Sequence, residues 1–201
     1  MKELIIATKN EGKVKEFRDM FSKYGVQIKS LLDFDEEIED IEEYGTTFEQ
    51  NAAIKAEAIS TEYNVPVLAD DSGLEIDGLN GAPGVYSARY AGEEKDDQKN
   101  IEKVLSELKD STEEARAARF VCAAAVARPG NDTFIKKGFC EGRITLDQRG
   151  ENGFGYDPIF VPEGSNRTLA EHTPEEKNSI SHRKHAILQL EEWIKEQAEM
   201  E

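Results

Sequence analysis

The chain has 201 residues, 38% of them hydrophobic, and its 42 acidic and 25 basic side chains give a formal net charge of −17. This charge excludes non-specific binding to nucleic acid or to an anionic membrane, because both require a positive protein surface. The sequence contains no run of about 18 apolar residues that could span a bilayer. We therefore expect a cytoplasmic protein that forms one domain over residues 1–201.

The first elements predicted are a strand, a turn and a helix. Residues 4–7 (LIIA) predict the strand, and apolar residues at helical spacing over residues 13–24 predict the helix. The turn between them, residues 8–13 (TKNEGK), ends on Lys13 at the start of the helix, where N–H groups and the helix dipole favour phosphate. A plain turn explains these residues equally well, since the P-loop pattern is absent.

An acidic segment follows the second predicted strand, residues 27–32. Residues 33–43 carry eight carboxylates, most of which we interpret as a solvated face. A capping box at residues 46–49 (TTFE) then predicts a helix to about residue 62, on which Asn51 and Lys55 lie one turn apart.

Two adjacent carboxylates, Asp70 and Asp71, come where the apolar run 65–69 (VPVLA) should end as a buried strand. Like charges this close are unfavourable unless a cation or a shared proton relieves them, so the pair predicts a Mg²⁺ site or an acid/base pair. A solvated Asp-Asp turn is the structural alternative. The glycines and proline of residues 78–84 indicate an irregular loop of the kind that lines a site.

The second half of the chain continues the alternation of strands and helices. Asp96 or Asp97 is predicted to cap a helix, and the apolar run 118–128 predicts a central strand. The two cysteines, Cys122 and Cys140, are expected to be free thiols. Together the elements predict an α/β fold with a mixed sheet whose strand order the sequence does not reveal. The remaining predicted elements are one or two strands in residues 133–144 and a last helix over residues 182–198.

Six segments, in order and at plausible spacing, resemble the inosine triphosphate pyrophosphatase family. Members hydrolyse non-standard purine nucleoside triphosphates such as ITP, dITP and XTP to the monophosphate and pyrophosphate. The resemblance implies this activity, a mixed twisted sheet flanked by helices, two lobes with the active site in the cleft between them, and a homodimer. The segments are residues 7–13 (ATKNEGK), 47–56 (TFEQNAAIKA), 69–74 (ADDSGL), 81–90 (GAPGVYSARY), 153–160 (GFGYDPIF) and 176–183 (EKNSISHR).

Two mild departures from the family pattern do not weaken the resemblance. Lys9 stands where members often have glycine, and an extra lysine in a phosphate loop is harmless or helpful. Gln50 stands where they often have glutamate, and we expect it to cap its helix.

The resemblance also implies a role for individual residues. Asp71 takes the role of the general base that activates the water attacking the α-phosphorus, and Asp71 and Glu42 resemble the Mg²⁺ ligands, with Asp70 and Glu43 as supplements. Mg²⁺ prefers oxygen ligands and keeps waters, so one or two carboxylates suffice. Lys13 and Lys55 would balance the triphosphate. The implied substrate-binding residues are Thr8, Lys9, Asn10, Glu11, Gly12, Lys13, Lys55, Ser72, Phe154, Gly155, Tyr156, Asp157, Lys177, His182 and Arg183.

The resemblance also implies a purine pocket, in which hydrogen-bond chemistry would select the base. Hypoxanthine and xanthine carry a 6-oxo group that donors from Lys177, His182 or Arg183 would recognise. The 6-amino group of adenine would leave those donors buried and unpaired. Phe154, with Tyr156, would stack on the purine ring.

Two other classes of function remain as alternatives. A nucleotide-binding sensor without turnover would not need Asp70, Asp71 and all the candidate lysines. An acidic interaction protein would explain the charge but not the loops around residues 81–90 and 153–160.

Overall fold

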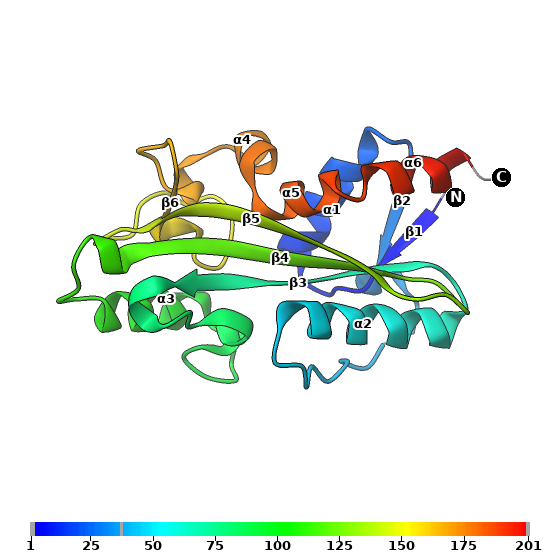
Figure 1. Ribbon diagram of the computed structural model, residues 1–201, viewed down its shortest axis with the longest axis horizontal. Helices are drawn as coiled ribbons and strands as arrows, with labels where there is room; N and C mark the ends of the chain where they lie inside the picture. Colours follow the sequence, from blue (N-terminus) through cyan, green and yellow to red (C-terminus); the bar gives the residue numbers. More distant parts are fainter. Residues whose placement is uncertain (1–2, 37, 200–201) are drawn as a thin grey trace. The chain divides into compact units, whose positions relative to one another are not determined.

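The computed structural model describes residues 3–36 and 38–199 (Figure 1). The chain forms two compact units. The strands β3 (Val67–Ile76), β4 (Ala117–Ala127) and β5 (Phe134–Ile144) each begin in one unit and end in the other. The first unit comprises Met1–Asp71, Cys122–Gly138 and Arg183–Glu201, and the second comprises Ser72–Val121 and Phe139–His182. The single domain over residues 1–201 stays a prediction.

The sheet is mixed, and its six strands follow the order β2-β1-β3-β4-β5-β6. Strand β1 pairs in parallel with β2 and with β3, whereas β5 and β6 are antiparallel. The predicted α/β fold with a mixed sheet is therefore confirmed. The strands are β1 (Glu3–Ile6), β2 (Gln27–Ser30), β3 (Val67–Ile76), β4 (Ala117–Ala127), β5 (Phe134–Ile144) and β6 (Phe160–Pro162).

In the first unit, helices cover both faces of the sheet (Figure 1). Helices α1 (Glu11–Ser22), α5 (His182–Leu188) and α6 (Glu191–Glu199) lie on one face, and α2 (Phe48–Tyr63) lies on the other. The inward residues of α1 and α6 join the strands in one apolar cluster, which removes their side chains from water. This cluster includes Leu4, Ile6, Phe17, Phe21, Leu68, Val126, Ile187 and Ile194.

The second unit has its own core, built against α3 (Asp97–Glu107). Asp96 caps this helix, as predicted, by accepting a hydrogen bond from the Lys99 N–H at 3.0 Å. Short 3₁₀ turns, Asp77–Leu79 and Gly84–Arg89, lie at the two ends of the predicted irregular loop. Gly78 is required there because a Cβ would lie 2.4 Å from the Ala115 carbonyl oxygen. The core includes Leu74, Ile76, Ile101, Val104, Leu108, Phe120, Ile144, Tyr156, Phe160 and Leu169.

The prediction of one continuous helix over residues 182–198 is wrong, because this segment forms two helices, α5 and α6. The N–H groups of Gln189 and Leu190 bond three residues back, to Ala186 and Ile187, which closes α5 in a tight final turn. Neither glycine nor proline marks this break, so the sequence carries no signal for it. The apolar stripe of Ile187, Leu190 and Ile194 is nevertheless buried, as its spacing requires.

Helix α4 (Pro174–Ile180) is a helix that our sequence analysis did not predict. Its signal was present, because Thr173 and Glu176 form a capping box and Pro174 occupies the first helical position.

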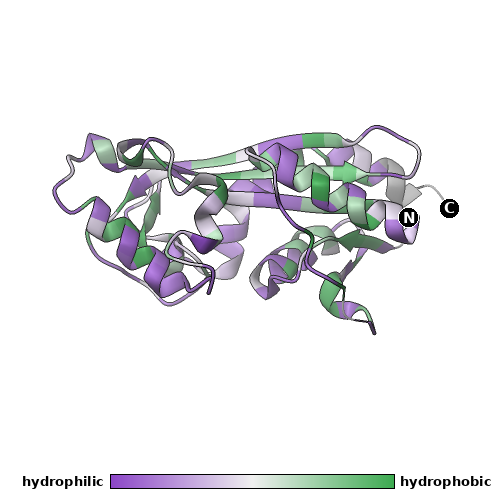
Figure 2. Cartoon of the chain, turned by 90° about the horizontal axis from the view of Figure 1, so that it is seen from below, coloured by the Kyte–Doolittle hydropathy of each residue, from purple (hydrophilic) through white to green (hydrophobic). Residues whose placement is uncertain are grey.

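Figure 2 shows hydrophilic residues over much of the helices and loops. No helix among residues 3–36 and 38–199 is both long and apolar enough to cross a membrane. Cys122 and Cys140 are free and buried, which confirms that prediction.

Candidate active site

Asp70 and Asp71 lie in the middle of β3 and not at its end, so the predicted boundary of this strand is wrong. The strand continues to Ile76 because Leu74 and Ile76 are needed in the core of the second unit. Successive side chains of a strand point to opposite faces of the sheet, which separates the two carboxylates. Asp70 contacts Lys13 of α1, whereas Asp71 contacts α2.

The Asp70 carboxylate belongs to a buried ion-pair network. Its Oδ2 lies 2.9 Å from Lys13 Nζ and 3.3 Å from the Arg183 guanidinium, which also pairs with Glu16. Burial alone would raise the pKa of the Asp70 carboxyl, but Lys13, Arg183 and Lys55 hold that pKa well below its usual range. Asp70 is therefore a fixed negative charge that orients two cations.

Arg183, which the resemblance placed among the purine contacts, lies in a buried ion-pair network, and its contact with the purine stays a prediction. Its side chain is only 2% exposed, and the guanidinium lies 5.7 Å from the Phe17 ring centroid while pairing with two carboxylates. A buried arginine requires such partners, since an uncompensated charge in the interior is costly. The structure thus places Arg183 within the network that holds Asp70.

Asp71 is held by two side chains of α2 that lie one turn apart. Asn51 Nδ2 donates to Asp71 Oδ2 at 3.2 Å, and Lys55 Nζ lies 3.8 Å from Asp71 Oδ1. Burial raises the pKa of the Asp71 carboxyl, and Lys55 and Lys13 only partly oppose this. A carboxylate with a raised pKa is a stronger base than a solvated one, which suits it to accept a proton.

Lys55 connects Asp71 to the acidic loop that precedes α2. Its Nζ pairs with Glu43 at 2.7 Å and donates to the Asp70 carbonyl oxygen at 2.7 Å. Burial would lower the pKa of Lys55, but Asp71, Glu43 and Asp70 raise it, so its charge is retained. Lys55 is therefore a largely buried cation, with 13% of its side chain exposed.

The oxygen donors around Lys55 fit a Mg²⁺ ion. Asp71 and Glu43 both approach the same ammonium group, and Mg²⁺ takes one or two carboxylates and keeps several waters. Glu42, the implied ligand, is exposed, whereas Glu43, the implied supplement, is partly buried beside Lys55. Within the described part of the chain, no cluster of three or more His, Cys, Asp or Glu residues is gathered as a metal site. The ligands of the metal therefore stay a prediction.

The turn before α1 is held by hydrogen bonds from its own side chains, and Asn10 caps the helix. Asn10 Oδ1 accepts from the Lys13 N–H at 3.0 Å, and Thr8 Oγ1 accepts from the Asn10 N–H at 3.2 Å. Helix α1 begins at Glu11, so Lys13 lies in its first turn. Lys9 forms an ion pair with Asp40 at 2.7 Å. Phosphate binding by this turn stays a prediction.

The charges around β3 nearly balance. Three cations lie beside four carboxylates, so these seven side chains alone do not form a positive site for a triphosphate. A divalent cation would supply the missing charge. These side chains are Lys13, Lys55 and Arg183 against Glu16, Glu43, Asp70 and Asp71.

The second unit positions another group of predicted residues around Phe154. Lys177 Nζ pairs with Asp157 Oδ2 at 2.6 Å and lies 4.5 Å from the Phe154 ring centroid. Asp157 Oδ2 also accepts from the Phe154 N–H at 3.0 Å, and Gly153 leaves room for it, since a Cβ there would lie 2.0 Å from that oxygen. The Phe154 backbone is thereby held by Asp157, its ring faces Lys177, and the residue is partly exposed.

Other predicted residues of this unit have structural contacts. Tyr156 is 4% exposed and its hydroxyl donates to the Ser87 carbonyl oxygen at 2.7 Å, so its ring is part of the core. The Gly155 N–H donates to Asp97 at 2.8 Å. The His182 ring stacks on Phe120 at 5.0 Å between centroids. Ser72 follows Asp71 on β3 and is partly exposed. Because the Tyr156 ring is buried in the core, stacking on the purine stays a prediction for Phe154 alone.

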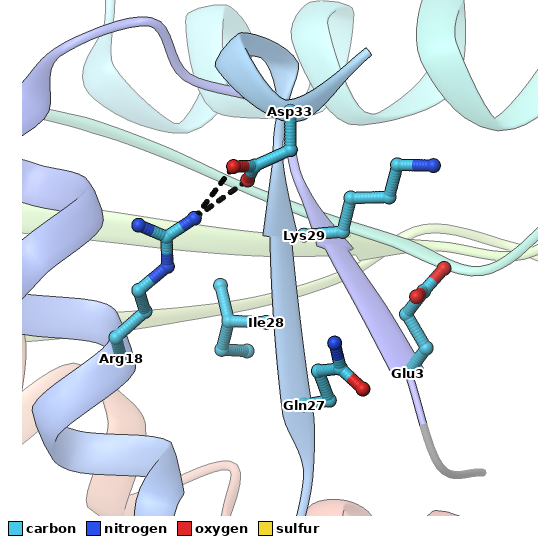
Figure 3. A pocket seen from close by; sticks show the side chains of 6 residues that line it. All are labelled: Glu3, Arg18, Gln27, Ile28, Lys29 and Asp33. Atoms are coloured by element: carbon cyan, nitrogen blue, oxygen red, sulfur yellow. Dashed lines mark hydrogen bonds and ion pairs between the residues drawn. The ribbon is translucent and has the colours of Figure 1, made fainter.

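A surface hollow of the first unit contains none of the predicted site residues (Figure 3). Arg18 crosses it to bind Asp33 through both carboxylate oxygens, at 2.9 and 2.6 Å. It is lined by Glu3, Arg18, Gln27, Ile28, Lys29 and Asp33.

Two residues of the site were not predicted from the sequence. Asn51 was noted one turn from Lys55 but was given no role, although residues four apart on a helix share a face. Glu16 lies three residues from Lys13 among the apolar inward positions of α1, and a carboxylate there needs a buried cation. In both cases the position of the residue one helical turn from a predicted site lysine could have identified it.

The mixed six-stranded sheet and its flanking helices are shared with solved structures. The structure of the Ham1 protein from Staphylococcus aureus matches with a TM-score of 0.85 at 43% identity, covering 98% of this chain and 100% of that chain. A HAM1 protein from Coxiella burnetii matches with a TM-score of 0.86 at 41% identity and the same coverage. The fold is therefore that of the Ham1 proteins.

The sequence comparisons identify the family. The Ham1 family model matches residues 4–193, and this chain belongs to that family. A protein named dITP/XTP pyrophosphatase from Halalkalibacterium halodurans is 60% identical over 194 residues, or 96% of this chain and 100% of the relative. A protein of the same name from Bacillus subtilis is 56% identical over 194 residues, covering 96% and 98%. The family resemblance inferred from the six segments is confirmed.

Proposed function

We propose that this protein hydrolyses the non-standard purine nucleoside triphosphates ITP, dITP and XTP to the monophosphate and pyrophosphate. The observation that carries the proposal is the buried Asp71 carboxylate, held between Asn51 and Lys55 with a raised pKa, in a chain of the Ham1 family. Relatives of 55% identity and more, named dITP/XTP pyrophosphatase, support the substrate class.

In this mechanism Asp71 takes a proton from the water that attacks the α-phosphorus, and the bond to the pyrophosphate oxygen breaks. Lys13 and Lys55 stabilise the negative charge that develops on the leaving group. Mg²⁺, held by Asp71 with Glu43 or Glu42, would supply further positive charge when bound. Attack at the α-phosphorus makes pyrophosphate, and not orthophosphate, the first product.

Phe154 and Lys177 provide a platform for the purine in this proposal. The ring of Phe154 offers a stacking face, and Lys177, His182 or Arg183 donates to the oxo groups of hypoxanthine or xanthine. Arg183 is the weakest of the three donors, because its guanidinium already pairs with Asp70 and Glu16. The 6-amino group of adenine is itself a donor and offers these side chains no acceptor, which disfavours ATP.

Product analysis tests the proposal. The protein is incubated with ITP, XTP, dITP, ATP or GTP and Mg²⁺, and pyrophosphate and orthophosphate are measured separately. We expect pyrophosphate from the first three substrates and a strong preference for them over ATP. Orthophosphate as the first product, or no preference over ATP, would contradict the proposal. Tight nucleotide binding without any turnover would favour the sensor alternative.

Replacing Phe154 with alanine is expected to raise KM for ITP with little change in kcat. Loss of a base–aromatic stack costs about 1–3 kcal/mol. The matched control is Phe134→Ala, because Phe134 is an exposed aromatic residue of β5 that we assign no contact with substrate. Steady-state kinetics separates the two parameters, and an unchanged KM in Phe154→Ala would exclude stacking by this ring.

We also infer from the family resemblance that the protein is a cytoplasmic homodimer whose substrates are small nucleotides and not nucleic acid. Multi-angle light scattering is expected to give twice the mass of one chain. The mass of a single chain across the concentration range would reject the dimer.

A further inference from the structure

We propose that Asn51 is a positioning residue that fixes the orientation of the Asp71 carboxylate and ties it to the loop before α2. The inference rests on the proposed function, since it deepens the account of how Asp71 acts. Asn51 is 1% exposed and lies at the inward side of α2, facing β3. Asn51 is uncharged and therefore does not contribute to the charge balance of the site. Its hydrogen bonds must account for the burial of its polar side chain.

The oxygen and the nitrogen of the Asn51 side-chain amide each form a hydrogen bond. Its Oδ1 accepts from the Gly45 N–H at 2.8 Å, and its Nδ2 donates to Asp71 Oδ2 at 3.2 Å. Because the Gly45 N–H can only donate, the atom of Asn51 that faces it must be the amide oxygen. The amide NH₂ group of Asn51 therefore faces Asp71. One side chain therefore connects the backbone of the loop to the proposed base.

The two carboxylate oxygens of Asp71 therefore have different partners. Asn51 binds Oδ2, and Lys55, one turn further along α2, approaches Oδ1 at 3.8 Å. Two fixed partners on one rigid helix determine the plane of the carboxylate. A general base must be held in such a geometry, because a displacement of about 1 Å can lower the rate by about 10²-fold.

Gly45 gives independent support for this arrangement. A Cβ at this position would lie 2.5 Å from Asn51 Oδ1 and 2.7 Å from Gln50 Cβ. Only glycine allows the loop backbone to approach the amide this closely. The loop that carries Glu43 is therefore fitted to Asn51, and a larger residue at position 45 must displace one of the two.

Gln50 provides a matched control next to Asn51. Its Oε1 accepts from the Thr46 N–H at 2.8 Å, so it also ties the loop to α2. The expected capping by Gln50 is wrong, because the helix is capped by Thr47, whose side chain accepts from the Gln50 N–H. Gln50 is exposed and we assign it no contact with Asp71. Comparing the two residues separates the stability of the loop from the orientation of the base.

The test uses the full chain with Asn51→Asp, Asn51→Ala, Gly45→Ala and Gln50→Ala. Asn51→Asp keeps an oxygen for Gly45 but removes the donor to Asp71, and Asn51→Ala removes both bonds without adding charge. We expect kcat for pyrophosphate release from ITP to fall about 10²-fold in both variants at position 51, with KM within about threefold of the wild type. Gly45→Ala should also lower kcat, whereas Gln50→Ala should keep it.

Crystal structures of the wild type and Asn51→Ala give a readout that does not depend on activity. We expect the Asp71 carboxylate to rotate away from its wild-type orientation in the variant while α2 stays in place. An unchanged carboxylate, or full kcat in a folded Asn51→Ala protein, would overturn the role of Asn51. A wild-type protein that releases no pyrophosphate would instead refute the proposed function, and the crystal structures would still decide the role of Asn51.

Discussion

Replacing Asp71 with asparagine is expected to lower kcat for ITP hydrolysis by about 10²- to 10⁴-fold, the range for loss of a general base. Asparagine has the same shape and can still accept a hydrogen bond from Asn51 at its amide oxygen. Lys55 keeps Glu43 and the Asp70 carbonyl oxygen as partners, so its charge remains compensated. The variant should therefore fold, and it should bind nucleotide in the absence of metal nearly as the wild type does.

The measurement combines steady-state kinetics with calorimetric binding in EDTA and thermal unfolding. Asp77→Asn is the matched control, because Asp77 makes the same kind of ion pair, with Arg119 at 3.0 Å, on the surface of the second unit. It should leave kcat unchanged. An Asp71→Asn protein that keeps kcat near the wild-type value would remove Asp71 from the mechanism.

Replacing Arg183 with methionine is expected to lower the free energy of unfolding by about 3–5 kcal/mol, the cost of removing one partner from a buried ion pair. The substitution keeps much of the side-chain volume but leaves Asp70 and Glu16 facing each other without the guanidinium. Asp70 is fully buried, so water does not replace the lost partner. Lys13 can compensate only one of these carboxylates, at its distance of 2.9 Å from Asp70.

Urea unfolding measures this loss, with Arg18→Met as the control. Arg18 pairs with Asp33 at 2.6 Å, but both side chains are more than a third exposed, so its removal should cost no more than about 1 kcal/mol. A double variant with Glu16→Gln should be less destabilised than the sum of the two single variants, because the residues interact directly. Equal losses for Arg183→Met and Arg18→Met would contradict the buried network.

Local patterns predicted most of the fold. The apolar run before Asp70 and the helical spacing of Phe17 and Phe21 gave the correct element types, because each follows from which side chains must leave water. The order of the strands was not predictable, since pairing joins segments far apart in the chain. The division of the last helix at Gln189 also lacked any local signal.

The candidate site was predicted in its residue types but not in its geometry. The motif around Asp70 and Asp71 identified the two carboxylates, yet it could not show that β3 continues through them and turns them to opposite faces. The ion-pair network around Arg183 was not predicted for a related reason. Its partners, Asp70 and Glu16, lie 113 and 167 residues away in the sequence, and only the folded sheet brings them together.

Hydrolysis in water enriched in ¹⁸O tests the central claim, that water attacks the α-phosphorus next to Asp71, most directly. The protein is incubated with ITP and Mg²⁺ through a single turnover, and both products are analysed by mass spectrometry. The account predicts one ¹⁸O atom in the nucleoside monophosphate and none in pyrophosphate. Label in pyrophosphate, with an unlabelled monophosphate, would place the attack on the β-phosphorus and contradict the mechanism.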